Sequence, residues 1–206
     1  MLGAENLLIS GDAPGIVATY VEQKLGAPVL FINGAAGNLA PIYSVQSLRN
    51  SHIKEFNVLL GDRILAANSA MGAGTAEIKL QIGEKIIETP LNKAFHWDDA
   101  LQSYLRVTPA GDTLVRIPIR FLTLGNDFAV WAAPVELFCE IAAEIRNRSS
   151  FPYTFYFGYA NGWLGYVPTR QAFAEGGYEV KTSPFTDRVE EDLTQGALAY
   201  LEAMRR

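Results

Sequence analysis

The stretch from Val115 to Glu136, VRIPIRFLTLGNDFAVWAAPVE, decides the fold class. Its two apolar runs flank the step Gly125-Asn126, which favours a turn, so the stretch predicts a β-hairpin. Just upstream, residues 76–91 (AEIKLQIGEKIIETPL) alternate at period two through Ile78, Leu80, Ile82 and Ile86. This alternation predicts one or two further strands.

Helical patterns surround these strands. Pro134 predicts the start of a helix whose apolar positions include Leu137, Phe138, Ile141 and Ile145. The C-terminal residues 187–206 predict an amphipathic helix with one apolar face, made of Val189, Leu193, Ala197, Tyr200, Leu201 and Met204.

The remaining segments complete the predicted order of elements. Asp12 and Gly26 bound a short helix with Ile16, Tyr20 and Leu25 on its apolar face, and residues 45–70 predict another helix. Residues 28–32 (PVLFI) and 152–159 (PYTFYFGY) predict two buried strands. The irregular alternation of helices and strands predicts an α/β fold with a mixed sheet flanked by helices, in a single domain over residues 1–206.

Composition excludes several classes of function. The net charge of −5 argues against a nucleic-acid-binding surface, which is normally basic. No apolar run approaches the roughly 18 residues that a membrane-spanning helix needs. The single cysteine, Cys139, excludes an internal disulfide framework, and the first residues lack the basic region of a signal peptide. The compartment and the oligomeric state stay open.

Two short motifs follow predicted strands. Residues 33–41 (NGAAGNLAP) have free backbone N–H groups that could hold an anion, but they lack the P-loop lysine and the dinucleotide glycine spacing. A tight turn is the simpler interpretation, and a nucleotide-binding domain rests on this loop alone. Glu136 is predicted in the first turn of a helix, where complementing the helix dipole is a sufficient explanation for a carboxylate.

The loop Gly158–Val180, GYANGWLGYVPTRQAFAEGGYEV, crowds four aromatic rings with polar tips: Tyr159, Trp163, Tyr166 and Tyr178. Turns explain its glycines, whereas such rings usually have something to hydrogen-bond or to ligate. A loop at the edge of the core, with tyrosines bonded to nearby backbone, is the alternative. His52 and His96 are the only histidines, and neither lies at a spacing typical of a metal site.

Taken in order, LLISGDAPG, VLFINGAAGNLAP, APVE and GYANGWLGYVPT…EGGYEV resemble the neutral/alkaline non-lysosomal ceramidase family over nearly the whole chain. The resemblance implies a zinc-dependent amidohydrolase that cleaves the N-acyl amide of ceramide or of a related lipid-like small molecule. It implies Glu136 and Tyr166 as zinc ligands and Tyr178 as a catalytic donor to the oxyanion. Gly34, Gly37, Asn38 and Ala40 would form a loop beside the substrate.

Two departures from the family pattern qualify these expectations. Ala40 stands where the family has a serine, which leaves ceramide specificity open. The family's two histidine ligands belong to a region upstream of the matching segments, so we expect these 206 residues to be the C-terminal part of a catalytic domain, inactive alone. The alternative is a catalytically silent homologue or fragment that acts as a binding or structural domain.

Overall fold

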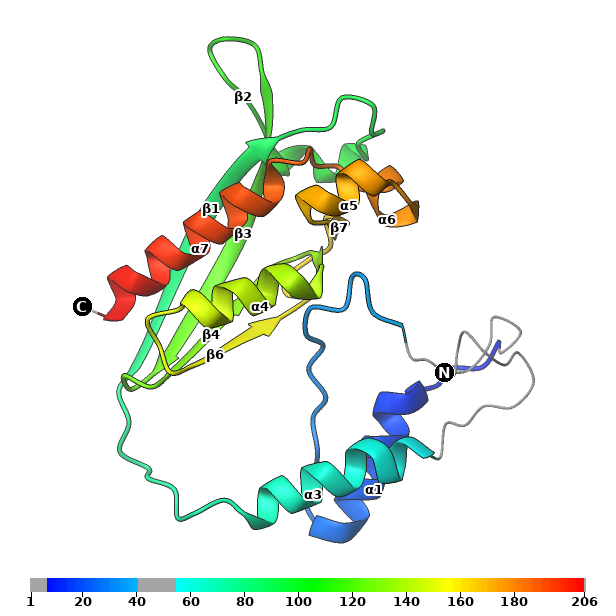
Figure 1. Ribbon diagram of the computed structural model, residues 1–206, viewed down its shortest axis with the longest axis vertical. Helices are drawn as coiled ribbons and strands as arrows, with labels where there is room; N and C mark the ends of the chain where they lie inside the picture. Colours follow the sequence, from blue (N-terminus) through cyan, green and yellow to red (C-terminus); the bar gives the residue numbers. More distant parts are fainter. Residues whose placement is uncertain (1–6, 41–54, 206) are drawn as a thin grey trace. The chain divides into compact units, whose positions relative to one another are not determined.

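The computed structural model describes residues 7–40 and 55–205 (Figure 1). The chain divides into two compact units. The first comprises residues 1–32 and 40–76, and the second comprises residues 33–39 and 77–206. The second unit contains the sheet and every predicted site residue except Ala40.

The described part of the first unit is helical. It contains α1 (Asp12–Leu25), a short π-helix (Asn57–Gly61) and α3 (Asp62–Ser69). Helix α1 ends as predicted at Gly26, which has a φ of 68°, but Val17 and Val21 make its buried face. The helix predicted over residues 45–70 is confirmed over its described part, while His52 lies outside the described residues.

The buried strand predicted at residues 28–32 is wrong. Leu30 is 88% exposed and Phe31 is 56% exposed, and the segment has no strand pairing among the described residues. The backbone N–H of Val29 instead donates to the Glu22 carboxylate, at 2.9 Å. An apolar run becomes a strand only where a neighbouring strand accepts its backbone hydrogen bonds, and the sequence of the run does not contain that information.

The second unit is built on a mixed sheet with the strand order β1-β3-β4-β6. The strands are β1 (Leu80–Pro90), β3 (Thr113–Leu124), β4 (Phe128–Ala132) and β6 (Tyr153–Phe157), and β2 (Leu105–Val107) pairs with β3. The pairs β1–β3 and β3–β4 are antiparallel, whereas β4–β6 is parallel. The predicted hairpin is confirmed, with Leu124 opposite Phe128 and a φ of 60° at Gly125.

Two helices, α4 (Cys139–Arg148) and α7 (Val189–Arg205), cover one face of this sheet (Figure 1). The buried face of α7 is close to the predicted one, and the ring of its Tyr200 stacks on Phe121 with the centroids 4.6 Å apart. Alternate residues of β3 are buried beneath the helices: Val115, Ile117, Ile119, Phe121 and Thr123. The predicted α/β fold with a mixed sheet flanked by helices is therefore confirmed.

The opposite face of the sheet is exposed. The period-two residues that predicted strand β1, including Leu80 and Ile82, point to this face and are 60% and 86% exposed. In β6, Tyr153 and Phe155 are exposed and only Thr154 and Tyr156 are buried, so the strand predicted as buried is buried on one face. Alternation predicted the strands correctly without showing which face the helices cover.

Smaller elements complete the second unit. They are a 3₁₀-helix (Asp99–Tyr104), the short strands β5 (Glu136–Leu137) and β7 (Tyr166–Val167), and the short helices α5 (Arg170–Glu175) and α6 (Tyr178–Lys181). Among the helices of the described ranges, none combines the length and the apolar character needed to cross a membrane.

Candidate active site

The site is framed by two very short strands beyond the end of β4. Strand β5 (Glu136–Leu137) pairs in parallel with β7 (Tyr166–Val167), so Glu136 and Tyr166 are direct partners. The N–H of Glu136 donates to the Gly165 carbonyl at 2.9 Å, and that of Phe138 donates to the Val167 carbonyl at 3.1 Å. Main-chain hydrogen bonds therefore hold the two predicted zinc ligands side by side.

The prediction that Glu136 lies in the first turn of a helix is wrong. Glu136 lies in β5, and α4 begins three residues later, at Cys139. Pro134 before Glu136 is a helix-start signal, but the pairing of β5 with β7 takes the backbone donors into a ladder instead. Tertiary pairing here overrides a local preference for helix. Because Glu136 is not in a helix, complementing a helix dipole no longer explains its carboxylate.

The glycine loop packs against β5. The Gly37 N–H donates to the Leu137 carbonyl at 2.9 Å, and a Cβ on Gly37 would lie 2.6 Å from the Glu136 carbonyl oxygen. The Asn38 side chain accepts from the Cys139 N–H at 2.9 Å and donates to Glu140 at 2.7 Å. These contacts position the backbone that carries Glu136 and the start of α4.

The other two predicted loop residues, Gly34 and Ala40, are more exposed than Gly37. Gly34 is exposed, and its carbonyl lies close to Gly158, whose N–H donates to the Asn33 carbonyl at 2.9 Å. Ala40 is exposed and belongs to the first unit.

The loop after β6 folds back over the segment that joins β4 to β5. The N–H groups of Ala160 and Leu164 donate to the carbonyls of Ala133 and Pro134, at 3.1 and 2.7 Å. Tyr159 adopts a φ of 56°, a conformation that costs energy for a bulky residue and is often found at functional sites. The fold-back brings the aromatic rings of this loop to β5.

Glu136 is the centre of an aromatic cluster, which we call the Glu136 cluster: Glu136, Tyr159, Trp163, Tyr166 and Tyr178. The Tyr159 hydroxyl donates to one carboxylate oxygen and the Trp163 indole N–H donates to the other, both at 2.8 Å. The sequence prediction assigned no role to Tyr159 or Trp163. The crowding of polar-tipped rings in one loop was the signal that pointed to them.

Tyr178 reaches the cluster through two glycines. Helix α5 (Arg170–Glu175) is followed by Gly176 and Gly177, with φ values of 82° and 121°, and Tyr178 then begins α6 (Tyr178–Lys181). The rings of Tyr166 and Tyr178 meet edge to face with their centroids 6.0 Å apart. Tyr178 is 65% exposed, so its hydroxyl is accessible from solvent.

The electrostatics of the cluster favour neutral tyrosines. Burial raises the pKa of Tyr166 to about 12, and the nearby negative charge of Glu136 acts in the same direction. Burial also raises the pKa of Tyr159, again with help from Glu136. The negative charge of Glu179 also raises the pKa of Tyr166, so the surroundings of this hydroxyl are acidic.

The cluster contains two side chains of the kind that can bind zinc. A carboxylate and a phenol oxygen are suitable ligands, but a zinc ion generally needs about four. Across residues 7–40 and 55–205, no three histidine, cysteine or carboxylate groups lie close enough to hold a metal. His96 is exposed. Glu136 and Tyr166 would therefore occupy two positions of a zinc site and leave the others unfilled.

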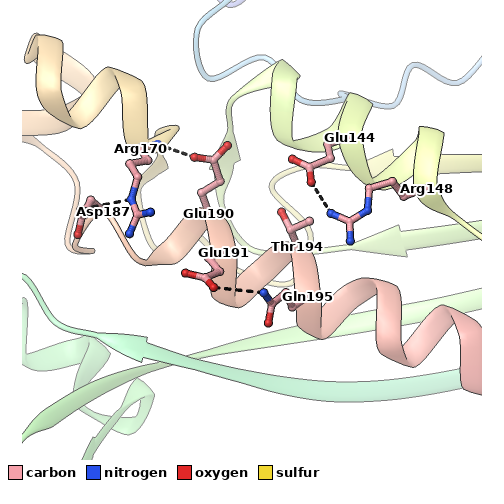
Figure 2. Close-up of a pocket in the computed structure, with 8 residues that line it drawn as sticks. All are labelled: Glu144, Arg148, Arg170, Asp187, Glu190, Glu191, Thr194 and Gln195. Atoms are coloured by element: carbon pink, nitrogen blue, oxygen red, sulfur yellow. Dashed lines mark hydrogen bonds and ion pairs between the residues drawn. The ribbon is translucent and has the colours of Figure 1, made fainter.

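A hollow of about 290 Å³ lies between α4, the start of α5 and α7 (Figure 2). Two ion pairs lie in its lining: Arg148 pairs with Glu144 at 2.5 Å, and Arg170 pairs with Asp187 at 3.6 Å. It shares no residue with the Glu136 cluster. We therefore place the candidate active site at the cluster.

Comparison with known proteins gives the fold a context. No protein-family model and no curated protein matches the chain. Among solved structures, "Ceramidase complexed with C2" matches with a TM-score of 0.68 at 17% identity, and neutral ceramidase from Pseudomonas aeruginosa matches with 0.67 at 17%. Each match covers 96% of this chain, which spans less than half of those chains, 43% and 42%. The resemblance predicted from the sequence is confirmed at the level of structure: the chain has a ceramidase-like fold.

Proposed function

We propose that this chain contributes to an amidohydrolase that cleaves the N-acyl amide of ceramide or of a related lipid-like molecule. The observation that carries the proposal is the pairing of Glu136 with Tyr166 across β5 and β7, within a ceramidase-like fold. The residues expected to bind metal and to contact the oxyanion lie in one cluster, although 30 positions separate Glu136 from Tyr166 along the chain. We also propose that residues 1–206 form the C-terminal part of the catalytic domain.

In this proposal Glu136 and Tyr166 hold zinc together with ligands from outside the described residues. Bound zinc would polarise the amide carbonyl and lower the pKa of a water molecule. Tyr159 and Trp163 each donate to one oxygen of the Glu136 carboxylate, which fixes its orientation. Such outer partners of a metal ligand commonly matter nearly as much as the ligand.

Tyr178 would act on the substrate. Its exposed side chain places its ring beside the Tyr166 ring, and its hydroxyl could donate to the oxygen that becomes negative as the amide is attacked. Gly37 and Asn38 would hold the backbone of β5 and the start of α4 in place. Ala40 brings no hydroxyl, so we propose the substrate class only as a lipid-like N-acyl amide.

A second candidate function is ligand or partner binding without catalysis. One observation favours it: both oxygens of Glu136 already accept hydrogen bonds from the protein, and the cluster offers two metal ligands. In this case the carboxylate would serve as a structural acceptor. Bound zinc would support the hydrolase, and a lack of bound zinc would support binding without catalysis.

The test uses the longest product of the natural gene, purified with zinc and assayed on a fluorescent short-chain N-acylsphingosine. We expect Glu136→Gln to lose the metal. We expect Tyr178→Phe to keep the metal and to lower kcat by about 10²–10³-fold, the usual effect of removing an oxyanion donor. Tyr153→Phe, on the sheet face, is the matched control and should be unchanged. Full activity in Tyr178→Phe, or stoichiometric zinc in Glu136→Gln, would contradict the proposal.

A further inference from the structure

The hollow between α4, α5 and α7 contains a buried hydroxyl group without a hydrogen-bond partner. Thr194 lies in the second turn of α7, is 3% exposed and lines the hollow. Its Oγ1 bonds to no other group in the part of the chain that the structure describes. Figure 2 shows this side chain pointing from α7 into the space between Glu190 and Glu144. A buried polar atom without a partner destabilises a fold, so it commonly marks a place that a bound molecule fills.

The two carboxylates of α7 beside Thr194 accept hydrogen bonds but have no cation. Glu190 accepts from the main-chain N–H of Arg170 at 2.5 Å, and Glu191 accepts from the Gln195 side-chain amide at 3.2 Å. Within residues 7–40 and 55–205, neither carboxylate forms an ion pair. The lining as a whole has four carboxylates and two guanidinium groups, which leaves a net charge of −2.

The helix dipole explains only part of this arrangement. Glu190 and Glu191 lie in the first turn of α7, where acidic side chains complement the dipole. The dipole does not explain the Thr194 hydroxyl, because a helical threonine can bond to the carbonyl one turn back and this one does not. Since residues three and four apart are neighbours on a helix surface, Thr194 adjoins both carboxylates. One side of α7 therefore provides three kinds of acceptor oxygen together.

The chemistry of these acceptors selects the class of ligand. A metal ion does not fit, because no three acidic, histidine or cysteine groups lie close enough to hold one among the residues that the structure describes. A primary ammonium group has one positive charge and three N–H donors, which suits two carboxylates and a hydroxyl. The volume of about 290 Å³ is that of roughly ten water molecules in the liquid, so an amine of a few carbon atoms has room.

We propose that this hollow binds a small primary alkylamine in its protonated form, with Glu190, Glu191 and Thr194 as acceptors. The Thr194 hydroxyl then gains a partner, and the ammonium charge offsets part of the negative charge of the lining. The proposal goes beyond the proposed function and does not depend on it, because the hollow shares no residue with the Glu136 cluster. Zinc and hydrolysis do not enter its test, so either proposal can fail without the other.

Methyl NMR on the longest product of the natural gene measures the binding. The methyl group of Thr194 reports on the hollow while n-butylammonium is added. Three comparison ligands each lack one feature: n-butanol has no charge, tetramethylammonium has no N–H donor, and guanidinium has its donors in one plane. We expect n-butylammonium to bind at least tenfold more tightly than each of them. Equal or tighter binding of any comparison ligand, or no saturable shift of the Thr194 methyl signal, would overturn the proposal.

A matched pair of variants tests the carboxylates. Glu191→Gln should weaken the binding of n-butylammonium about tenfold, because it removes a charge and keeps the shape of the side chain. Asp192→Asn is the control, since Asp192 lies in the same turn of α7 but pairs with Arg188 at 3.4 Å and does not line the hollow. Equal losses of affinity in the two variants would show that only the overall charge matters, which would overturn the proposal.

The Thr194→Val variant tests the hydroxyl in two ways. Valine has the shape of threonine without the hydroxyl, so the urea midpoint without ligand should equal or exceed that of the wild type. The valine methyl signals should show binding of n-butylammonium weakened about tenfold, because one acceptor is lost. A lower urea midpoint would show that the hydroxyl already has a partner within the protein. An unchanged affinity would show that the hydroxyl does not contact the amine, and either result would overturn the proposal.

Discussion

Gly37 is the position where one added methyl group should disturb the candidate site most directly. Its Cβ would lie 2.6 Å from the Glu136 carbonyl oxygen and 3.0 Å from the carbonyl carbons of Glu136 and Leu137. All three atoms are backbone, so no side chain can turn away to make room. In Gly37→Ala either the loop or β5 must shift.

The magnitude follows from these contacts. Overpacking of a well-packed region costs about 1–3 kcal/mol, and a loop shift would also weaken the hydrogen bond from Gly37 to Leu137, worth about 1 kcal/mol. We therefore expect the free energy of unfolding to fall by about 2–3 kcal/mol. For a chain of this size this corresponds to a Tm lower by roughly 5–10 °C.

Urea and thermal unfolding, followed by tryptophan fluorescence, measure this change. The three tryptophans, Trp97, Trp131 and Trp163, all lie in the unit that contains the sheet. Gly34→Ala is the matched control in the same loop, because its Cβ would meet only a backbone oxygen at 4.0 Å. If Gly37→Ala were as stable as Gly34→Ala, the inferred close packing of the loop on β5 would be refuted.

Three further predictions concern the same region. Asn38→Ala should lower the free energy of unfolding by about 1 kcal/mol, because the Cys139 N–H loses its acceptor. The free energy of unfolding of Asn38→Asp should lie between those of the wild type and Asn38→Ala, because aspartate keeps the acceptor but repels Glu140. Equal urea midpoints for wild type and Asn38→Ala would contradict this. Between pH 10, where an unfolded tyrosine ionises, and about 12, folded Tyr166 keeps a proton that the unfolded chain has lost, so its stabilising contribution is complete below pH 10 and is lost across this window. Absorbance at 295 nm should show a lower pKa of Tyr166 in Glu136→Gln. An unchanged pKa would show that the charge of Glu136 does not act on Tyr166. Finally, the 206-residue chain alone should bind zinc weakly or not at all and show no ceramidase activity, and stoichiometric zinc after dialysis would refute this.

Periodicity predicted the strands of the sheet better than it predicted which faces of those strands are covered. The alternation in residues 76–91 and the turn at Gly125-Asn126 predicted β1 and the β3–β4 hairpin, because strand sidedness and turn chemistry are local. The exposure of Ile82 could not be predicted, since covering a face depends on distant helices. Residues 28–32 failed as a strand for a related reason, because pairing needs a partner strand.

The candidate site was also predicted only in part. The sequence motifs singled out Glu136, Tyr166 and Tyr178, and the structure brings these residues together. The helix expected at Glu136 was wrong because its backbone pairs with a segment about 30 residues later. The hydrogen bonds from Tyr159 and Trp163 depend on a backward fold of their loop, which residue types alone do not determine.

The ladder between β5 and β7 has a consequence for how such a site tolerates change over time. The separation of Glu136 from Tyr166 is set by peptide groups, which every non-proline residue possesses, and not by the shapes of surrounding side chains. Side chains other than those that bond to the Glu136 carboxylate could then be exchanged without changing the separation of the two backbones. A chain sharing 17% of its residues with a solved ceramidase structure can keep that fold where main-chain hydrogen bonds of this kind set the spacing of its segments.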